Sequence, residues 1–270
     1  MPHYFNHSHT ELSTIPVSLM TKLVAHPDLF VIQTEYSIYV MLKYWMYLIH
    51  HKDDKETNIS NVNEYFCSRS DKTPYLYCTE GRGFIPVFQG LRLQNLISHL
   101  LDVLLITRDN IIPKSWLNPV ILQQWRNVLR VNQNEDKGPH DISDDQFLKD
   151  CLRCGRVIKS KDRHVWRWTG FHFGIDLLMI SDESKLSIKR NQRAESENVL
   201  LSFQPTRHVA IRVTVVRLNE QKQIIYSKQS DVQKINMSKG GEVQIMTLDK
   251  DLEYPIFISA NIMYSCPETV

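Results

Sequence analysis

The first half of the chain repeats its apolar residues with the period of an α-helix. Between residues 34 and 49 they recur every three or four positions, as on one helix face. Thr34 suits an N-cap, and Glu35 stands in the first turn, where the helix dipole favours a carboxylate. Weaker patterns of the same kind predict helices over residues 18–25, 87–105 and 119–130. The pattern therefore predicts a helical first half.

The second half changes to a period of two. Apolar Val209, Ile211, Val213 and Val215 alternate with His208, Ala210, Arg212 and Thr214. The run 256–263 has no polar face, which is typical of a strand covered on both sides. Further strands are predicted at 165–168, 174–180, 185–189, 200–203, 223–228 and 242–246, with turns at 182–184, 219–221 and 239–241. Such spacing favours an antiparallel sandwich or an open barrel.

A polar, acidic stretch with a Gly-Pro step separates the two patterns at residues 132–145. We therefore predict an α+β protein with an all-α domain over residues 1–131, a linker over 132–145 and a β-rich, sandwich-like domain over 146–270. A length of 270 residues agrees with two domains.

Composition narrows the class of protein. The chain has 32 Lys and Arg against 30 Asp and Glu, a net charge of +2 that is too small to attract nucleic acid non-specifically. Five cysteines are the wrong number for a disulfide scaffold and fit a reducing, intracellular compartment. The most apolar stretch, residues 96–106, is far shorter than the roughly 20 residues of a membrane span. We expect neither nucleic acid as a partner nor a membrane span.

The motif Cys151-Leu152-Arg153-Cys154 is the first candidate for chemistry, because two thiolates at this spacing can bind one zinc ion. A structural zinc site needs four ligands, and no second pair with suitable spacing follows. A metal-binding protein is therefore the less favoured alternative, and we expect neither a metal nor a cofactor. No P-loop, GxSxG, HExxH or dinucleotide-binding glycine motif is present, so we assign no catalytic residue and expect a non-enzymatic protein.

Aromatic residues are the more distinctive feature. Residues 166–174 place four of them at a period of two with an interleaved arginine. Aromatic and arginine side chains often anchor protein interfaces, but a sandwich core is the favoured reading of these aromatics. A basic run follows over residues 185–193. The predicted partner contacts on the β-rich domain are Arg167, His172, Arg190 and Arg193.

Several short segments resemble known proteins. They are HPDLFVIQTE at 26–35, LKYWM at 42–46, VF at 87–88, LRLQ at 91–94, PKSWL at 113–117, QQW at 123–125, RCGR at 153–156 and WRWTGF at 166–171. The first two resemble the BACK module that follows a BTB domain in many ubiquitin-ligase adaptors. Together the segments resemble the germ cell-less family from about residue 12 to residue 267.

The resemblance implies an adaptor whose BTB domain dimerises and binds cullin-3, while its BACK and C-terminal domains recruit a protein substrate for ubiquitination. It also implies a role in germ-cell formation and a location in the nucleus or at the nuclear envelope. Only about a dozen residues precede the BACK-like part. We therefore expect a BTB-less paralogue or a fragment, with weak or no binding to cullin-3. The alternative is a structural scaffold at the nuclear envelope without a ligase role.

Overall fold

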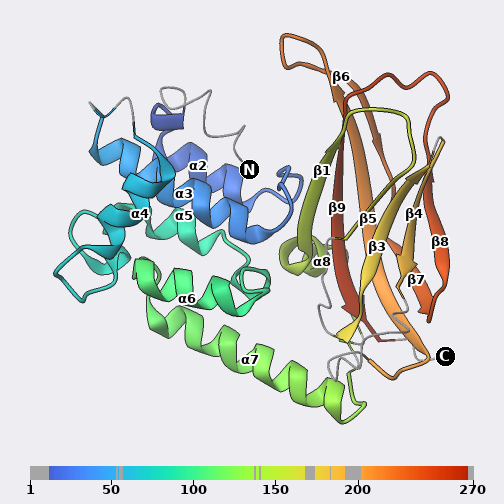
Figure 1. Cartoon of the computed structure of the whole chain (residues 1–270), viewed down its shortest axis with the longest axis horizontal. Coiled ribbons are helices and arrows are strands. Elements are labelled where there is room, and N and C mark those ends of the chain that lie inside the picture. Colours follow the sequence, from blue (N-terminus) through green and yellow to red (C-terminus); the bar gives the residue numbers. More distant parts are fainter. Residues whose placement is uncertain are drawn as a thin grey trace. The chain divides into compact units, whose positions relative to one another are not determined.

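The structure is a computed structural model that divides into two compact units. It describes residues 12–52, 54, 57–136, 138–139, 141–167, 174–182, 184–191 and 202–266. The helical unit comprises the chain up to Leu29 together with Glu35–Leu122, and the β unit comprises Phe30–Thr34 together with the chain from Gln123 onward. Helices therefore occupy the first half and antiparallel sheets the second, so the predicted α+β class is confirmed (Figure 1). Within the described residues, no helix has the length and apolar character needed to cross a membrane.

The helical unit is built around α3. Its helices are α2 (Val17–Ala25), α3 (Glu35–His50), α4 (Ile59–Cys67), α5 (Ile85–Gln89), α6 (Leu100–Asp109) and the first part of α7 (Lys114–Asn132). Short 3-10 turns cover Tyr75–Tyr77, Arg82–Phe84 and Leu93–Asn95. The predicted helix over 34–49 is confirmed, and its apolar face is buried at Tyr39, Leu42 and Trp45, each 0% exposed. The Trp45 indole donates a hydrogen bond to the Ile15 carbonyl (3.1 Å).

Two helix predictions were wrong in extent. Residues 87–105 form two helices with a 3-10 turn between them, because α5 ends at Gly90 and α6 starts with its own cap. At that cap the Asp102 carboxylate accepts hydrogen bonds from the backbone amides of Ser98 and His99, both at 2.9 Å. The last helix starts five residues before Pro119, which therefore lies inside α7 rather than in its first turn.

The short helix α4 was missed by the sequence analysis. It begins after Asn58, whose side-chain oxygen accepts the amides of Ser60 and Asn61 at 2.8 and 3.1 Å. This is a standard N-cap. The helix is only nine residues long and buries two of them, Val62 and Phe66. Two apolar positions are too few to reveal a helical period in the sequence.

One buried carboxylate joins three helices of this unit. Asp109, at the end of α6, is 0% exposed, and Lys43 of α3 contacts its Oδ2 with Nζ at 2.6 Å. Tyr39 donates to the same oxygen (2.9 Å), and Cys67 of α4 lies 3.6 Å from Oδ1. Lys43 also donates to Asn63 of α4 (2.6 Å). Burial, followed by the charge of Asp109, raises the pKa of Tyr39 well above its usual value, so its hydroxyl stays a donor.

The β unit consists of one short helix and two antiparallel sheets. The helix is α8 (Asp144–Asp150). The first sheet has the order β1 (Leu152–Ile158), β9 (Ile256–Ser265), β5 (Thr206–Leu218) and β6 (Ile224–Gln229), with β7 (Gln233–Ser238) also paired to β5. The second has the order β2 (His164–Arg167), β3 (Leu177–Asp182), β4 (Lys185–Arg190) and β8 (Glu242–Thr247).

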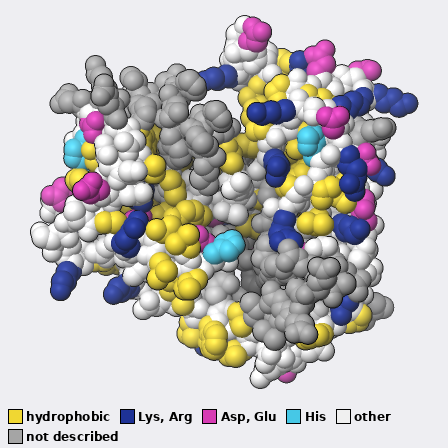
Figure 2. Space-filling view, in the orientation of Figure 1, with side chains coloured by type: hydrophobic (Ala, Val, Ile, Leu, Met, Phe, Trp, Pro, Cys, Tyr) yellow, Lys and Arg dark blue, Asp and Glu magenta, His cyan; other side chains and the backbone are white. Residues whose placement is uncertain are grey.

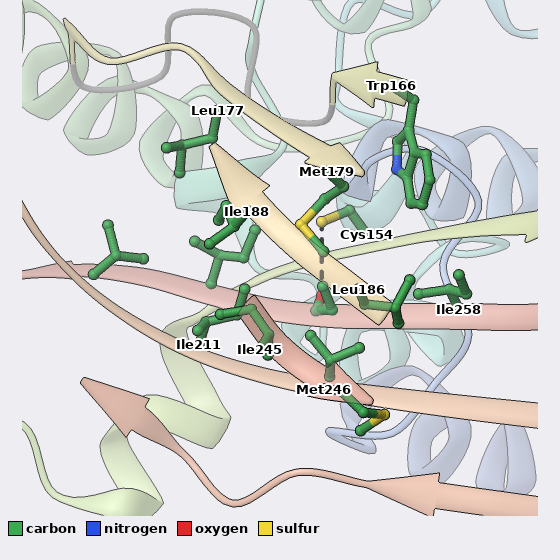
Figure 3. Close-up of a cluster of buried hydrophobic side chains, with 14 of the residues drawn as sticks. Cys154, Trp166, Leu177, Met179, Leu186, Ile188, Ile211, Ile245, Met246 and Ile258 are labelled. Atoms are coloured by element: carbon green, nitrogen blue, oxygen red, sulfur yellow. Dashed lines mark hydrogen bonds between the residues drawn. The ribbon is translucent and has the colours of Figure 1, made fainter. Parts of the chain in front are cut away.

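The two sheets share one hydrophobic core. Figure 3 shows Cys154, Ile211 and Ile258 of the first sheet beside Trp166, Met179 and Leu186 of the second. The predicted inward alternation of β5 is confirmed, since Val209, Ile211, Val213 and Val215 are all 0% exposed.

The outer face of the first sheet is partly covered as well. Ala210 of β5 packs with Phe147 of α8, and Phe257 of β9 contacts Phe30 edge to face, with ring centroids 5.4 Å apart. Asn261 of β9 is only 3% exposed. The prediction that the run 256–263 is covered on both sides is therefore confirmed.

Other elements of the β unit differ from the prediction. Helix α8 and strands β1 and β7 were not predicted, whereas the turns at 219–221 and 239–241 are confirmed. In the predicted strand 200–203, Ser202 and Phe203 lie outside any strand, and the first two residues are outside the described part. Part of the turn at 182–184 also lies outside it.

The segment Phe30–Thr34 packs on β1 although it comes from the first half of the chain. Ile32 forms a parallel bridge with Gly155, and the Gln33 amide donates to the Gly155 carbonyl at 3.1 Å. A Cβ atom on Gly155 would lie 2.8 Å from a ring carbon of Phe30 and 2.8 Å from the Val31 carbonyl oxygen. Only glycine permits this close approach.

We expect Gly155→Ala to lower the free energy of unfolding by about 1–3 kcal/mol, because the added methyl group must displace the Phe30 ring or the backbone beside it. Gly83→Ala is the matched control, since its Cβ would meet no atom within 4 Å. Urea denaturation of both variants measures the difference. Equal midpoints for Gly155→Ala and the wild type would contradict the close packing.

The buried carboxylate gives a second prediction. We expect Lys43→Met to lower the free energy of unfolding by about 3–5 kcal/mol, because it leaves the Asp109 charge buried without its cation. The double variant Lys43→Met/Asp109→Leu should be more stable than this single variant, since it removes both charges. A double-mutant cycle of thermal unfolding measures the coupling, with Lys22→Met on the exposed face of α2 as control. Additive effects would show that the two charges do not interact.

Candidate functional site

Among the predicted partner contacts, Arg190 lies inside the β unit. It is 3% exposed, and its guanidinium donates to four backbone carbonyls. These belong to Ser202 (3.2 Å), Gln204 (2.9 Å), Pro205 (3.3 Å) and Met237 (3.1 Å). Burial, followed by the charge of Arg207, lowers the pKa of this guanidinium from its usual value. The side chain therefore fixes residues 202–205 against β7.

Arg167 lies at the end of β2 and is partly accessible. Its side chain is 31% exposed and forms a two-point ion pair with the buried carboxylate of Asp176, with Nε–Oδ1 at 2.6 Å and Nη2–Oδ2 at 2.8 Å. Asn191 also donates to Asp176 Oδ2 (2.8 Å). This geometry holds the guanidinium in one orientation. The other two predicted contacts, His172 and Arg193, lie outside the described residues.

The described part of the aromatic run lies in the core of the β unit. Trp166 is 4% exposed and belongs to the core, while residues 168–173 lie outside the described part.

Cys151 and Cys154 are both 0% exposed, but they pack in different hydrophobic clusters. Burial raises the pKa of the Cys154 thiol well above its usual value, which disfavours the thiolate that metals bind. In the described part of the chain, no three His, Cys, Asp or Glu side chains are grouped as a metal ion requires.

A pocket in the helical unit was missed by the sequence analysis. It has a volume of about 550 Å³ and lies between the end of α4, the loop that follows it, the end of α6 and the start of α7. Its apolar wall includes Phe66, Pro74 and Pro113. Four basic residues and one acidic residue line it, namely Arg69, Lys72, Arg108, Lys114 and Asp71. We call it the basic pocket.

Hydrogen bonds between the loop after α4 and the end of α6 hold the lining of the basic pocket in place. Asn110 follows α6 in the left-handed conformation (φ 49°, ψ 38°), which asparagine tolerates better than most residues. Its side-chain amide donates to the carbonyls of Lys72 (3.0 Å) and Thr73 (3.4 Å). The amides of Tyr75 and Leu76 donate to the carbonyls of residues 110 and 111 at 2.8 and 3.2 Å. The loop after α4 is thus tied to the end of α6.

Arg69 is the most enclosed cation of the basic pocket. Its side chain is 17% exposed, and its guanidinium lies 4.9 Å from the centre of the Tyr75 ring, in a cation–π contact. Nη2 donates to the Cys78 sulfur (2.9 Å) and lies 3.8 Å from Asp71 Oδ2. Nη1 is buried and has no hydrogen-bond partner among the described residues.

The other charges of the basic pocket are exposed. Lys72, Arg108 and Lys114 form no ion pair with a carboxylate of the described residues. The single acid, Asp71, has a pKa lowered from its usual value, chiefly by hydrogen bonds from Thr73. The pocket therefore carries four positive charges and one negative charge at neutral pH. The four cations come from three separate segments, so no sequence motif could have indicated it.

Exposed apolar side chains form a second surface feature of the helical unit. Leu100, Leu101 and Leu104 of α6 are 74%, 60% and 57% exposed. Ile121 and Leu122 on α7 are exposed as well, at 38% and 50%. Figure 2 shows hydrophobic side chains gathered over this part of the unit, whereas basic and acidic side chains intermix over the β unit. The exposed leucines offer contact area but no chemistry that selects a ligand.

The chain is similar to three named proteins over nearly its whole length. It is 38% identical over 283 residues to Protein germ cell-less of Drosophila melanogaster, which covers 95% of this chain and 50% of that protein. It is 32% identical over 270 residues to Germ cell-less protein-like 1 of Homo sapiens (97% and 52%). It is 31% identical over 259 residues to Germ cell-less protein-like 2 of Homo sapiens (93% and 49%). The chain thus spans about half the length of these curated relatives. No protein-family model matches it.

The environment of Arg190 yields a prediction on stability. We expect Arg190→Met to lower the free energy of unfolding by about 3 kcal/mol, because four carbonyls lose their donor. Lys185→Met, an exposed position on the same strand, should change it by less than about 0.5 kcal/mol. Chemical denaturation compares the two. If Arg190→Met kept wild-type stability, the guanidinium would not support residues 202–205.

Proposed function

We propose that this chain, which belongs to the germ cell-less family and spans about half the length of its relatives, is the substrate-recognition part of a cullin-3 ubiquitin ligase adaptor, as a BTB-less paralogue or a fragment. In this proposal the helical unit is a BACK-like domain and the β unit is the recognition domain. The chain itself is a non-catalytic adaptor, and its substrate is a protein that acts in germ-cell formation, in the nucleus or at its envelope.

The similarity that extends through both units is the observation that carries this proposal. It covers 93–97% of the chain, so it includes the α3 segment that resembles a BACK module as well as the strands of the β unit. A helical module followed by a β-rich module suits the substrate-recognition part of an adaptor, in which the β-rich module holds the substrate. The partly exposed Arg167 remains our candidate for a substrate contact on the β unit.

The proposal can be tested by capturing proteins that bind residues 1–270 and measuring the half-lives of those proteins. Tagged chain is expressed in cells, bound proteins are identified by mass spectrometry, and their decay is followed with and without cullin-3. We expect at least one bound protein to decay more slowly when either the chain or cullin-3 is removed. Cells depleted of a different cullin serve as the control and should show unchanged decay.

Two outcomes would overturn the proposal. The first is that every bound protein keeps its half-life when the chain is removed. The second is that the chain changes the half-life of a bound protein equally with and without cullin-3. Stable binding without turnover would favour the scaffold alternative.

A further inference from the structure

We propose that the basic pocket binds an anionic side chain, a carboxylate or a phosphoryl group, in an acidic segment of a protein partner. The inference concerns binding by the helical unit alone and does not depend on a role for cullin-3. It rests on the charge, the lining and the fixed shape of the pocket.

Charge is the first argument. Lys72, Arg108 and Lys114 face one pocket and have no carboxylate of the described residues as a partner. The only acid on the lining, Asp71, is already engaged by Thr73 and lies near Arg69. Like charges gathered in a concave surface focus the electrostatic field, which raises the local concentration of an anion. A ligand with one or two negative charges would offset the repulsion among the cations.

The unpaired nitrogen of Arg69 is the second argument. Buried donors in proteins are nearly always hydrogen-bonded, yet Nη1 of this guanidinium has no partner among the described residues. Because Nη1 is buried and Nη2 donates to the Cys78 sulfur, the guanidinium attracts an anion in the pocket through its positive charge. The stacking on Tyr75 holds the guanidinium plane in place, so a ligand need not order it.

Size and lining favour a peptide. A volume of about 550 Å³ exceeds what a single inorganic anion requires and lies within the range of ligand-binding clefts. Phe66, Pro74 and Pro113 supply an apolar wall for the aliphatic part of a side chain. Nucleic acid is a poorer fit, because backbone recognition needs a longer track of basic residues than one pocket with four cations.

The pocket is also fixed before a ligand arrives. Asn110 and the amides of Tyr75 and Leu76 tie the loop to the end of α6. The adjacent carboxylate of Asp109 joins α6 to α3. A preformed site loses little conformational entropy on binding, so a short peptide can bind measurably.

Fluorescence anisotropy with the full chain tests the inference. The probes are three fluorescein-labelled peptides of equal length, one rich in glutamate, one with a phosphoserine among neutral residues, and one fully neutral. We expect either anionic peptide to bind and the neutral one not to bind, with affinity falling as salt rises towards about 0.15 M. The tighter of the two anionic peptides identifies a carboxylate or a phosphoryl group as the preferred ligand.

Charge-reversal variants locate the site. Arg108→Glu/Lys114→Glu should weaken binding of the anionic peptides by at least about tenfold. Lys22→Glu is the matched control, because Lys22, like Arg108, is an exposed base in the last turn of a helix. This control should change the affinity for the peptides by less than about twofold, because an exposed charge outside the pocket is screened by solvent and contributes little to binding. If the double variant unfolds at a lower midpoint, Lys72→Glu on the exposed loop replaces it.

Three results would overturn the inference. They are an absence of binding by both anionic peptides, an equal loss of binding in the control and the pocket variants, and a single-stranded RNA that displaces the peptides and binds more tightly. Each is obtained with purified chain and leaves the test of substrate turnover unaffected.

Discussion

The helical unit depends on keeping one carboxylate charged and paired in its interior. Asp109 is fully buried, so its charge is tolerable only beside Lys43 and the donors around it. These partners come from α3 and α4, which fixes both helices against the end of α6. The next residue, Asn110, then turns left-handed and holds the loop that carries Lys72. The residues that satisfy a buried charge thus adjoin those that shape the basic pocket.

Periodicity predicted the elements that bury one continuous face. The spacing along α3 and the alternation along β5 both reflect burial against a core, so these elements were predicted correctly. Periodicity does not predict where local caps end or start a helix, as at Gly90 and at the start of α6. It also missed β1, where the buried Arg153 interrupts the apolar pattern. The sequence does not distinguish a buried arginine from a solvated one, because the difference lies in their tertiary contacts.

The same limit applies to the candidate sites. The basic run over residues 185–193 was predicted to lie on the surface, yet Arg190 is buried among backbone carbonyls. Conversely, Arg69 and Lys114 are 45 positions apart and line one pocket. No motif search joins residues at that separation, because the loop after α4 must first be tied to α6. Charge in this chain is therefore informative only after the contacts are known.

The position of Phe30–Thr34 has a consequence for dissecting this protein. Because that segment belongs to the β unit while its neighbours on both sides belong to the helical unit, the polypeptide passes between the units three times. Cleaving the chain once near residue 122 would separate the β unit from Phe30–Thr34, the segment that packs on Gly155. The helical fragment would keep this segment without the strand with which it pairs. Each unit is compact in itself, but the two are interleaved in connectivity. An independent β unit would therefore have to be made as a circular permutant, or with the segment Phe30–Thr34 grafted beside β1.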